Sequence, residues 1–394
     1  MFWKADEPRA LREAGEIALA AKHYDAARDL ARRGIRAYPL DGINYRVLAM
    51  ADAAQGRMSN VPLLLAIAEQ RSQRDMPTRV LIASYALKSG DVPKALHELG
   101  LNLRIEPEIQ PLLLPRMAAL ASIPQARPAI IGVLSENPPW RPSFLRVLAT
   151  QASDSAAVAE IFNGLRLTRI ESDMLIDRQI RDLDFTSAYV TWVATLPDEQ
   201  RAALSNVFDG GFRFPLSNGG FGWRVTTDAE VDARVGPLRD GSGRGYSADF
   251  DQSRVRFEGL RQRLVLGPGR YVLSGRTRST DLTTGRGLQW VITCAQGHNQ
   301  SLAASPLLTG THPWTTFEVA FEVPSARCAG QWLRFQMAAR DRIAGHVETA
   351  DIHIERTGSE SPEAATVKVA DTPSKQRRCK PHCDRARRRR GRLR

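Results

Sequence analysis

The sequence predicts a solenoid of helical hairpins, followed by an antiparallel β-sandwich and a disordered basic tail. Small residues recur every 34 residues through the first hundred positions, which is typical of stacked helical repeats. After residue 200 the hydrophobic period changes from 3.6 to 2, as expected for strands. The final 20 residues hold 11 of the 55 Lys and Arg but only one of the 43 acidic residues.

Residues 8–108 contain three units of the helical repeat. The units align when the sequence is shifted by 34 residues, with small or apolar residues where two helices would cross and glycine in two of the three turns. Proline closes the first and third units because it cannot continue a helix. The aligned sets are Gly15, Ala49 and Ala83; Lys22, Gly56 and Gly90; Ala27, Val61 and Ala95; Ala31, Leu65 and Leu99; and Pro39, Gln73 and Pro107.

This repeat resembles the tetratricopeptide repeat. The tract from Lys22 through Tyr24 and Ala31 to Pro39 is similar to the second helix of that motif, although Lys22 replaces the usual turn glycine. The resemblance implies a concave groove that binds a peptide or a protein partner. Helical periodicity continues to residue 200 without the small-residue signature, which indicates degenerate repeats and a cap. The expected helices are 112–120, 127–134, 143–150, 156–165 and 174–196.

Residues 206–357 are predicted to form a β-sandwich or jelly roll. Glycine, threonine and aromatic residues become frequent, and short alternating segments are separated by turns such as 266–269. With no helix between the strands, a sandwich is the expected architecture. The expected strands are 221–226, 231–235, 255–257, 261–266, 270–278, 287–294, 315–323, 331–338 and 349–355.

Alternation within these strands separates core residues from surface residues. It assigns Trp290 to the core and leaves a polar set with one tryptophan on the outside. An exposed indole beside arginine and glutamine suits a sugar, because the ring packs on a pyranose while the polar groups bind hydroxyls. The alternative is an ordinary solvated face, or an interface with the helical region. The candidate carbohydrate-binding residues are Arg276, Gln289, Trp332, Arg334 and Gln336.

The β region resembles galactose-binding-like jelly rolls. The tracts 206–212, 221–223, 262–275 and 345–354 are similar to their opening, central and closing strands. The resemblance implies a carbohydrate-binding module, some members of which hold a structural Ca²⁺. Asp209 and Asp351 are the corresponding possible metal ligands, but Arg213 stands where an acidic residue is common. Otherwise these two aspartates cap a turn and a strand end.

The cysteines bear on the cellular compartment. Cys294 ends one predicted strand and Cys328 precedes another, so a disulfide is one reading and two free thiols the other. A disulfide would indicate an oxidising compartment. The start of the chain lacks a secretory signal, which leaves either a cytoplasmic protein or a periplasmic or envelope-associated one with a missing export segment. In the tail, Cys379, His382 and Cys383 are too few ligands for a typical zinc site.

The tail also explains the net charge. Of the formal charge of +12, residues 375–394 contribute 11 basic residues against one acidic residue, so the remainder is nearly neutral. The tail, residues 358–394, is expected to be disordered, and its basic part from residue 375 is expected to bind polyanions such as nucleic acid, anionic lipid or acidic polysaccharide. The tail contains no aromatic residue for base stacking. No apolar run reaches the ~18 residues of a membrane-spanning helix.

The sequence contains no catalytic motif that we recognise. The pairs Asp249 with Asp251 and Glu318 with Glu322 each lie at period 2 on one strand, which is typical of a solvated face. We therefore predict a non-catalytic binding or scaffold protein without a cofactor. Its solenoid would bind a protein and its jelly roll a carbohydrate, in bacterial cell-envelope polysaccharide assembly or export. The alternatives are a scaffold that binds no sugar and, third, a glycan-active enzyme.

Overall fold

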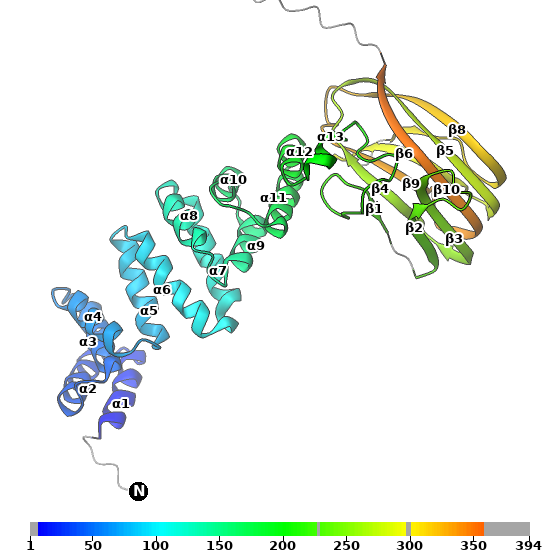
Figure 1. Cartoon of the computed structure of the whole chain (residues 1–394). Coiled ribbons are helices and arrows are strands. Elements are labelled where there is room, and N and C mark those ends of the chain that lie inside the picture. Colours follow the sequence, from blue (N-terminus) through cyan, green and yellow to red (C-terminus); the bar gives the residue numbers. More distant parts are fainter. Residues whose placement is uncertain (1–6, 227–228, 297–300, 358–394) are drawn as a thin grey trace, which may run out of the picture. The chain divides into compact units, whose positions relative to one another are not determined.

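The computed structural model describes residues 7–226, 229–296 and 301–357 (Figure 1). The chain divides into two compact units, residues 1–356 and 357–394. Helices occupy the first part of the larger unit and strands the second, which confirms the predicted fold class for these residues. The basic tail, with Cys379, His382 and Cys383, lies outside the described residues.

Three hairpins with the predicted 34-residue spacing open the chain. They are α1 (Pro8–Ala20) with α2 (Tyr24–Ala37), α3 (Gly42–Ala54) with α4 (Val61–Arg71), and α5 (Met76–Lys88) with α6 (Val92–Ile105). The small residues at the helix crossings are buried: Gly15, Ala27, Ala31 and Ala95. Tyr24 packs against the core of the first hairpin. The repeat prediction is confirmed.

The turn of each hairpin adopts the left-handed backbone conformation. Gly56 and Gly90 have φ of 75° and 81°, a region that glycine enters without steric penalty. Lys22 occupies the same place in the first hairpin with φ of 63°. The departure from the repeat pattern therefore changes the residue but keeps the geometry. Pro39 and Pro107 follow the ends of α2 and α6, as expected.

The remaining helices are shorter and less regular. They are η1 (Pro107–Ile109), α7 (Gln110–Ala119), η2 (Leu120–Ser122), η3 (Pro124–Ala126), α8 (Arg127–Ser135), α9 (Arg141–Gln151), α10 (Ser155–Asn163), α11 (Arg169–Arg181), α12 (Phe185–Ala194) and α13 (Asp198–Ala202). The expected continuous helix 174–196 is wrong. Leu183 has φ of 64°, and the Asp184 carboxylate caps the start of α12 by accepting from the Ser187 N–H.

No single described helix is long and apolar enough to cross a membrane. One bent pair of segments, Pro107–Ser122 and Pro124–Ser135, together meets the criteria of length and composition.

Ten strands form two five-stranded antiparallel sheets, as a sandwich requires. Sheet A has the order β1-β4-β9-β6-β7 and sheet B the order β2-β3-β10-β5-β8. The strands are β1 (Arg224–Val225), β2 (Val231–Pro237), β3 (Arg244–Val255), β4 (Glu258–Leu264), β5 (Gly269–Thr284), β6 (Leu288–Cys294), β7 (Ser301–Ala304), β8 (Gly310–Val323), β9 (Gln331–Met337) and β10 (Asp341–Thr357). Most of β3, the first half of β10 and all of β7 were not expected. Small and charged residues interrupt the alternation in β3 and β10, and β7 is only four residues long.

The inner faces of the two sheets enclose one core. Trp290, Leu333 and Phe335 are at most 1% exposed, which confirms the alternation read from the sequence. Cys294 and Cys328 are both buried and form a disulfide, with their Cα atoms 5.0 Å apart. The predicted disulfide is therefore confirmed.

An aromatic cluster lies where the helices give way to the sandwich. Trp192 on α12 contacts Phe208 and Phe221, with ring centroids 5.0 and 5.7 Å away. Gly220 has φ of 53°, and a Cβ there would lie 2.2 Å from the Trp192 ring. The segment that opens the sandwich is thus packed against the last long helix.

Candidate functional site

The structure divides the predicted carbohydrate-binding residues between two surfaces. Trp332, Arg334 and Gln336 on β9 and Gln289 on β6 share the outer face of sheet A, whereas Arg276 lies on β5 of sheet B. The expectation of a single face is wrong for Arg276. Alternation shows which side chains point away from the core, but it does not show which of the two sheets a strand joins.

On sheet A, arginine side chains surround Trp332. Arg263 pairs directly with Trp332 across β4 and β9, and Arg261 pairs with Arg334. The guanidinium carbons of Arg263, Arg334 and Arg261 lie 4.6, 5.2 and 5.5 Å from the Trp332 ring centroid. Three cations therefore pack on this ring, which leaves less of it open to a sugar than the sequence indicated.

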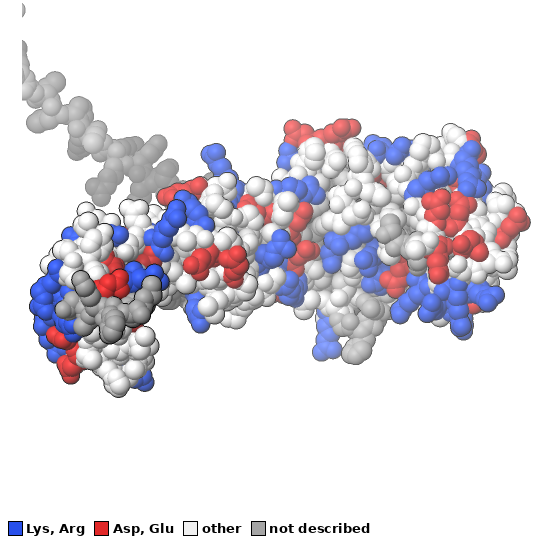
Figure 2. All heavy atoms as spheres, turned by 90° about the horizontal axis from the view of Figure 1, so that it is seen from below, with Lys and Arg blue, Asp and Glu red and all other residues white. Residues whose placement is uncertain are grey.

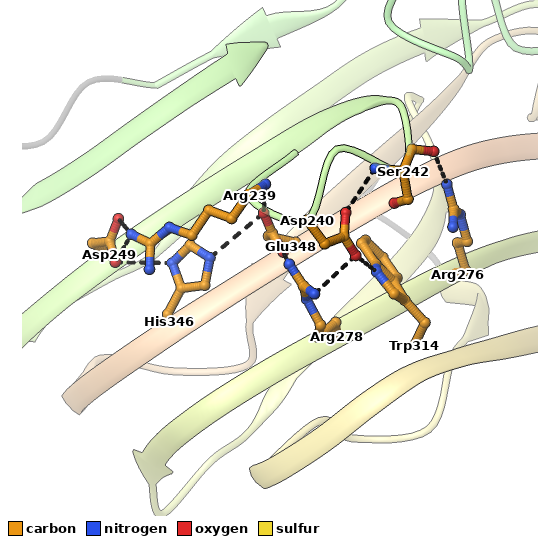
Figure 3. A network of polar contacts seen from close by, with 9 residues as sticks. All are labelled: Arg239, Asp240, Ser242, Asp249, Arg276, Arg278, Trp314, His346 and Glu348. Carbon is orange, nitrogen blue, oxygen red and sulfur yellow. Dashed lines mark hydrogen bonds and ion pairs between the residues drawn. The ribbon is translucent and has the colours of Figure 1, made fainter. Parts of the chain in front are cut away.

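On sheet B, a continuous polar network crosses the outer face (Figure 3). Its residues come from the 238–243 loop, from β3, β10 and β5 in the middle of the sheet, and from the edge strand β8. We call this set the sheet B network. It comprises Arg239, Asp240, Ser242, Asp249, Arg276, Arg278, Trp314, His346 and Glu348.

Glu348 is the buried centre of the sheet B network. Its side chain is 0% exposed, and one carboxylate oxygen accepts a hydrogen bond of 3.0 Å from the backbone N–H of Arg239. The other carboxylate oxygen, Oε2, accepts from the Arg278 guanidinium. His346 Nε2 lies 3.7 Å from Oε1, the oxygen that Arg239 binds. A buried carboxylate is tolerated only with such partners, so Glu348 fixes the positions of the loop and of Arg278.

Asp240 joins the loop to the edge strand. Its carboxylate accepts from the Trp314 indole N–H at 2.6 Å, from Arg278 at 2.9 Å and from the Ser242 backbone N–H at 2.9 Å. These bonds, those from Ser242 first, hold the pKa of Asp240 well below its ordinary value. Asp240 is therefore an anion at any physiological pH, and it fixes the plane of the Trp314 ring.

Trp314 is the half-buried aromatic residue of the sheet B network. The guanidinium carbons of Arg276 and Arg278 lie 4.6 and 5.1 Å from its ring centroid. Arg276 also donates to Asp351 at 2.6 Å, so it bridges Trp314 and the bend in β10. The sequence signal for Trp314 was available. Extending the alternation of Phe317 backwards places residue 314 on the outer face.

The aspartate and glutamate pairs considered for catalysis are bound to neighbours or exposed. Asp249 accepts from Arg239 at 2.6 and 2.7 Å and contacts His346 Nδ1 at 2.8 Å. Asp251 accepts from the Ser253 hydroxyl at 2.7 Å. Asp249 and Asp251 share β3, as expected, and Asp249 is a member of the sheet B network rather than an isolated carboxylate.

The possible metal ligands have protein partners in the structure. Asp209 accepts from the backbone N–H groups of Arg213 and Phe214 at 2.7 and 2.9 Å, and burial raises its pKa. Asp351 pairs with Arg276. Within the described residues, no group of three or more His, Cys, Asp or Glu side chains is arranged to hold a metal. Asp209 therefore caps a turn, as the alternative stated, whereas Asp351 lies within β10 rather than at a strand end and pairs with Arg276.

The helical region has a separate pocket. It has a volume of about 290 Å³ and is lined by residues of α4, α5 and the start of α6. Leu65, Ile82 and Tyr85 provide its apolar wall, while Glu69 and Lys94 provide charges. An apolar wall with a few charged groups is the lining typical of a ligand-binding pocket.

Comparison with known proteins gives similarity of fold only. No family model and no curated protein sequence matches the chain. A solved carbohydrate-binding module of family 4 (15% identity, TM-score 0.30) covers 38% of this chain and 99% of its own. The match to the structure of Pseudomonas aeruginosa pilF (12% identity, TM-score 0.28) covers 48% of this chain and 89% of that chain. The enzymatically active domain of a bacteriophage CBA120 tailspike (14%, TM-score 0.26) covers 39% and 21%.

Proposed function

We propose that the β-sandwich binds a carbohydrate on the outer face of sheet B and that the helical region binds a protein partner. The observation that carries the first part is the sheet B network. It places a half-buried indole, Trp314, beside charged groups whose positions are fixed by their own hydrogen bonds. Such preorganisation lowers the entropic cost of binding a ligand that has many weak polar contacts.

The chemistry of the network fits a sugar. Sugar hydroxyls both donate and accept, and the carboxylates of Asp240 and Asp249 accept while Arg239 and Arg276 donate. Asp249, Arg239 and Asp351 retain between 36% and 53% of their side-chain surface. The free lone pairs and N–H groups on that surface are available to hydroxyls. The part of the Trp314 ring that Arg276 and Arg278 leave uncovered supplies an apolar contact for the C–H face of a pyranose.

The biological setting is a second part of the same proposal. A buried disulfide favours an oxidising compartment, so we place the protein in the periplasm or at the cell envelope, in polysaccharide assembly or export. There the helical region would hold an assembly protein while the sandwich holds the glycan. A scaffold that binds no sugar is the alternative.

A glycan array with the full-length chain tests the sugar site. We expect binding that Trp314→Ala lowers by roughly tenfold or more, in line with the loss of one aromatic contact and its oriented hydrogen bond. Trp332→Ala is the matched control for the neutral glycans of the array, because it removes the same side chain from the other sheet. If only Trp332→Ala lost binding, the sugar site would lie on sheet A. If the wild type bound no glycan, the alternative of a protein scaffold that binds no sugar would be favoured.

The same samples separate binding from catalysis. If the wild-type chain released reducing ends from a bound glycan and Asp249→Asn abolished this release, the protein would be an enzyme and the binding proposal would be wrong. We expect no release.

The protein-binding part is tested at the pocket of the helical region. Capture from an envelope extract with the wild type, followed by mass spectrometry, should give a protein that Tyr85→Ala no longer retains. Tyr45→Ala is a suitable control, because Tyr45 lies on a neighbouring hairpin and does not line the pocket.

A further inference from the structure

The arginine residues around Trp332 on sheet A form a second feature that the sheet B network does not explain. Arg224, Arg261 and Arg334 are consecutive across β1, β4 and β9, because Arg224 pairs with Arg261 and Arg261 pairs with Arg334. Arg263 lies two residues from Arg261 on the same face. We call these four the sheet A arginines. All four are half-buried.

This arrangement is unfavourable for the protein alone. Like charges directly opposite each other on a sheet repel, and here the repulsion is repeated across two strand pairs. Burial, with repulsion from Arg224 and Arg261, lowers the pKa of Arg263 to about 10. Burial also lowers the pKa values of Arg224 and Arg334. None of the four forms an ion pair with a described carboxylate, although Asp173, Asp177 and Glu258 are close enough to influence them.

Each of the sheet A arginines has a donor without an acceptor, although Arg224 donates to the Gly220 carbonyl at 3.4 Å and Arg334 to the Thr293 hydroxyl at 3.2 Å. Nε of Arg224, Arg261 and Arg334 and Nη1 of Arg263 are all shielded from solvent without a partner in the described structure. Elsewhere in this chain, half-buried and buried arginines are paired, as Arg79 is with Glu98 and Arg141 with Glu171. Unmet donors on four neighbouring cations therefore point to an acceptor that is supplied from outside the chain.

We propose that the sheet A arginines bind the carboxylate or sulfate group of an acidic saccharide. An oxyanion fits because guanidinium groups bind carboxylate and sulfate through two parallel N–H donors. A saccharide fits because Gln336 and Gln289 pair on the same face, one step of roughly 6.8 Å beyond Arg334. Their amides would bind hydroxyl groups of the sugar that carries the anion. The saccharide part of this inference rests on the proposed function, whereas the oxyanion part does not.

Three ligands separate the parts of the inference. The first is a glucuronate-containing tetrasaccharide, the second is its carboxyl-reduced neutral counterpart, and the third is inorganic sulfate at constant ionic strength. Isothermal titration uses the full-length chain, so that any contribution of the basic tail is the same in every variant. Arg261→Gln and Arg334→Gln test the site. Arg270→Gln is the matched control, because Arg270 is exposed on sheet B and its substitution removes the same charge.

The acidic tetrasaccharide should bind the wild type and Arg270→Gln with equal affinity. It should bind Arg261→Gln and Arg334→Gln with an affinity that is lower by roughly tenfold or more. The neutral counterpart should bind the wild type at least about tenfold more weakly than the acidic tetrasaccharide does. Equal binding of the two tetrasaccharides, with no effect of the arginine variants, would overturn this inference while leaving the sheet B proposal intact. Binding of sulfate without the tetrasaccharide would overturn the assignment to a saccharide.

A stability measurement guards against variants that simply misfold. Arg261 has no described hydrogen bond and faces two other arginines, so Arg261→Gln should raise the melting temperature in a chloride buffer without sulfate, phosphate or carboxylates. The ligand should then raise the melting temperature of the wild type more than that of the variant. If Arg261→Gln melted lower than the wild type without ligand and both gained equally with it, Arg261 would be a structural residue and the inference would be wrong.

Discussion

Removing the disulfide should destabilise the sandwich without altering the three hairpins that open the chain. Cys294 and Cys328 are 34 residues apart and are 1% and 3% exposed. We consider the double substitution Cys294→Ala and Cys328→Ala, which opens this loop and leaves no buried polar group behind. The solenoid contains no cysteine, so its unfolding serves as an internal reference.

The magnitude follows from the length of the closed loop. Constraining a loop of about this length lowers the entropy of the unfolded chain, which corresponds to about 4 kcal/mol at 25 °C. For a domain of roughly 150 residues, each kcal/mol shifts the melting temperature by about 2–4 °C. The transition of the sandwich should therefore fall by roughly 8–16 °C.

Differential scanning calorimetry with near-ultraviolet circular dichroism would resolve the two transitions. Reducing the wild type should reproduce the shift, and Cys379→Ser with Cys383→Ser should not. A shift below about 2 °C would show that the unfolded chain is already restricted in this loop and would refute the entropic reasoning.

Four further predictions concern the buried polar groups, the junction and the tail. Glu348→Gln should lower the free energy of unfolding by about 3–5 kcal/mol in urea titration, because it leaves Arg278 partly unpaired, whereas exposed Glu318→Gln should change it little. Burial raises the pKa of Glu171, but bonds from Thr168 and Arg141 outweigh it and the net pKa lies below 4.5. Its stabilisation is thus present above pH 4.5 and lost as pH falls through the lower folded pKa, so Glu171→Gln should flatten the acid limb of thermal unfolding. Trp192→Ala should cost about 3–5 kcal/mol and lower both calorimetric transitions. Truncation after Ser374 should leave both transitions unchanged and lower the salt concentration that elutes the chain from a heparin column, because the contribution of the tail is lost while that of the sheet A arginines remains.

The sequence predicted the fold well where a pattern repeats. The spacing of Gly15, Ala27 and Ala31 predicted the hairpins, and alternation predicted the core positions of Trp290 and Phe335. These patterns work because each position has one dominant requirement, either a close helix crossing or a buried face. The break between α11 and α12 was missed because it depends on a single left-handed residue, Leu183, whose side chain gives no such signal.

The candidate site was predicted less well, and the reason is topology. Arg276 and Trp332 satisfy the same alternation rule, but the strand order separates them onto opposite sheets. Strand order depends on long-range pairing, which local periodicity does not encode. The buried pairing of Glu348 with Arg278 spans 70 residues and was equally invisible. Residue types suited to a sugar were thus predictable from the sequence, but their grouping was not.

The place of β10 in sheet B has a consequence for synthesis of the chain. This strand is the last of the sandwich in sequence, yet it lies in the middle of the sheet, between β3 and β5 (Figure 1). While a ribosome is still translating residues 341–357, the strand that joins β3 to β5 is missing. The pairs β2-β3 and β5-β8 therefore cannot yet combine into one sheet. The hairpins that open the chain, whose contacts are local, can fold long before that point.

The nascent sandwich must therefore wait for its final strand, with its aromatic core residues exposed meanwhile. Charged side chains along the emerging strands would limit self-association during this interval. Figure 2 shows Lys and Arg interspersed with Asp and Glu on the face that it presents. The residues that surround the candidate sugar site would then also act as solubility elements during synthesis, before the sheet that supports them exists.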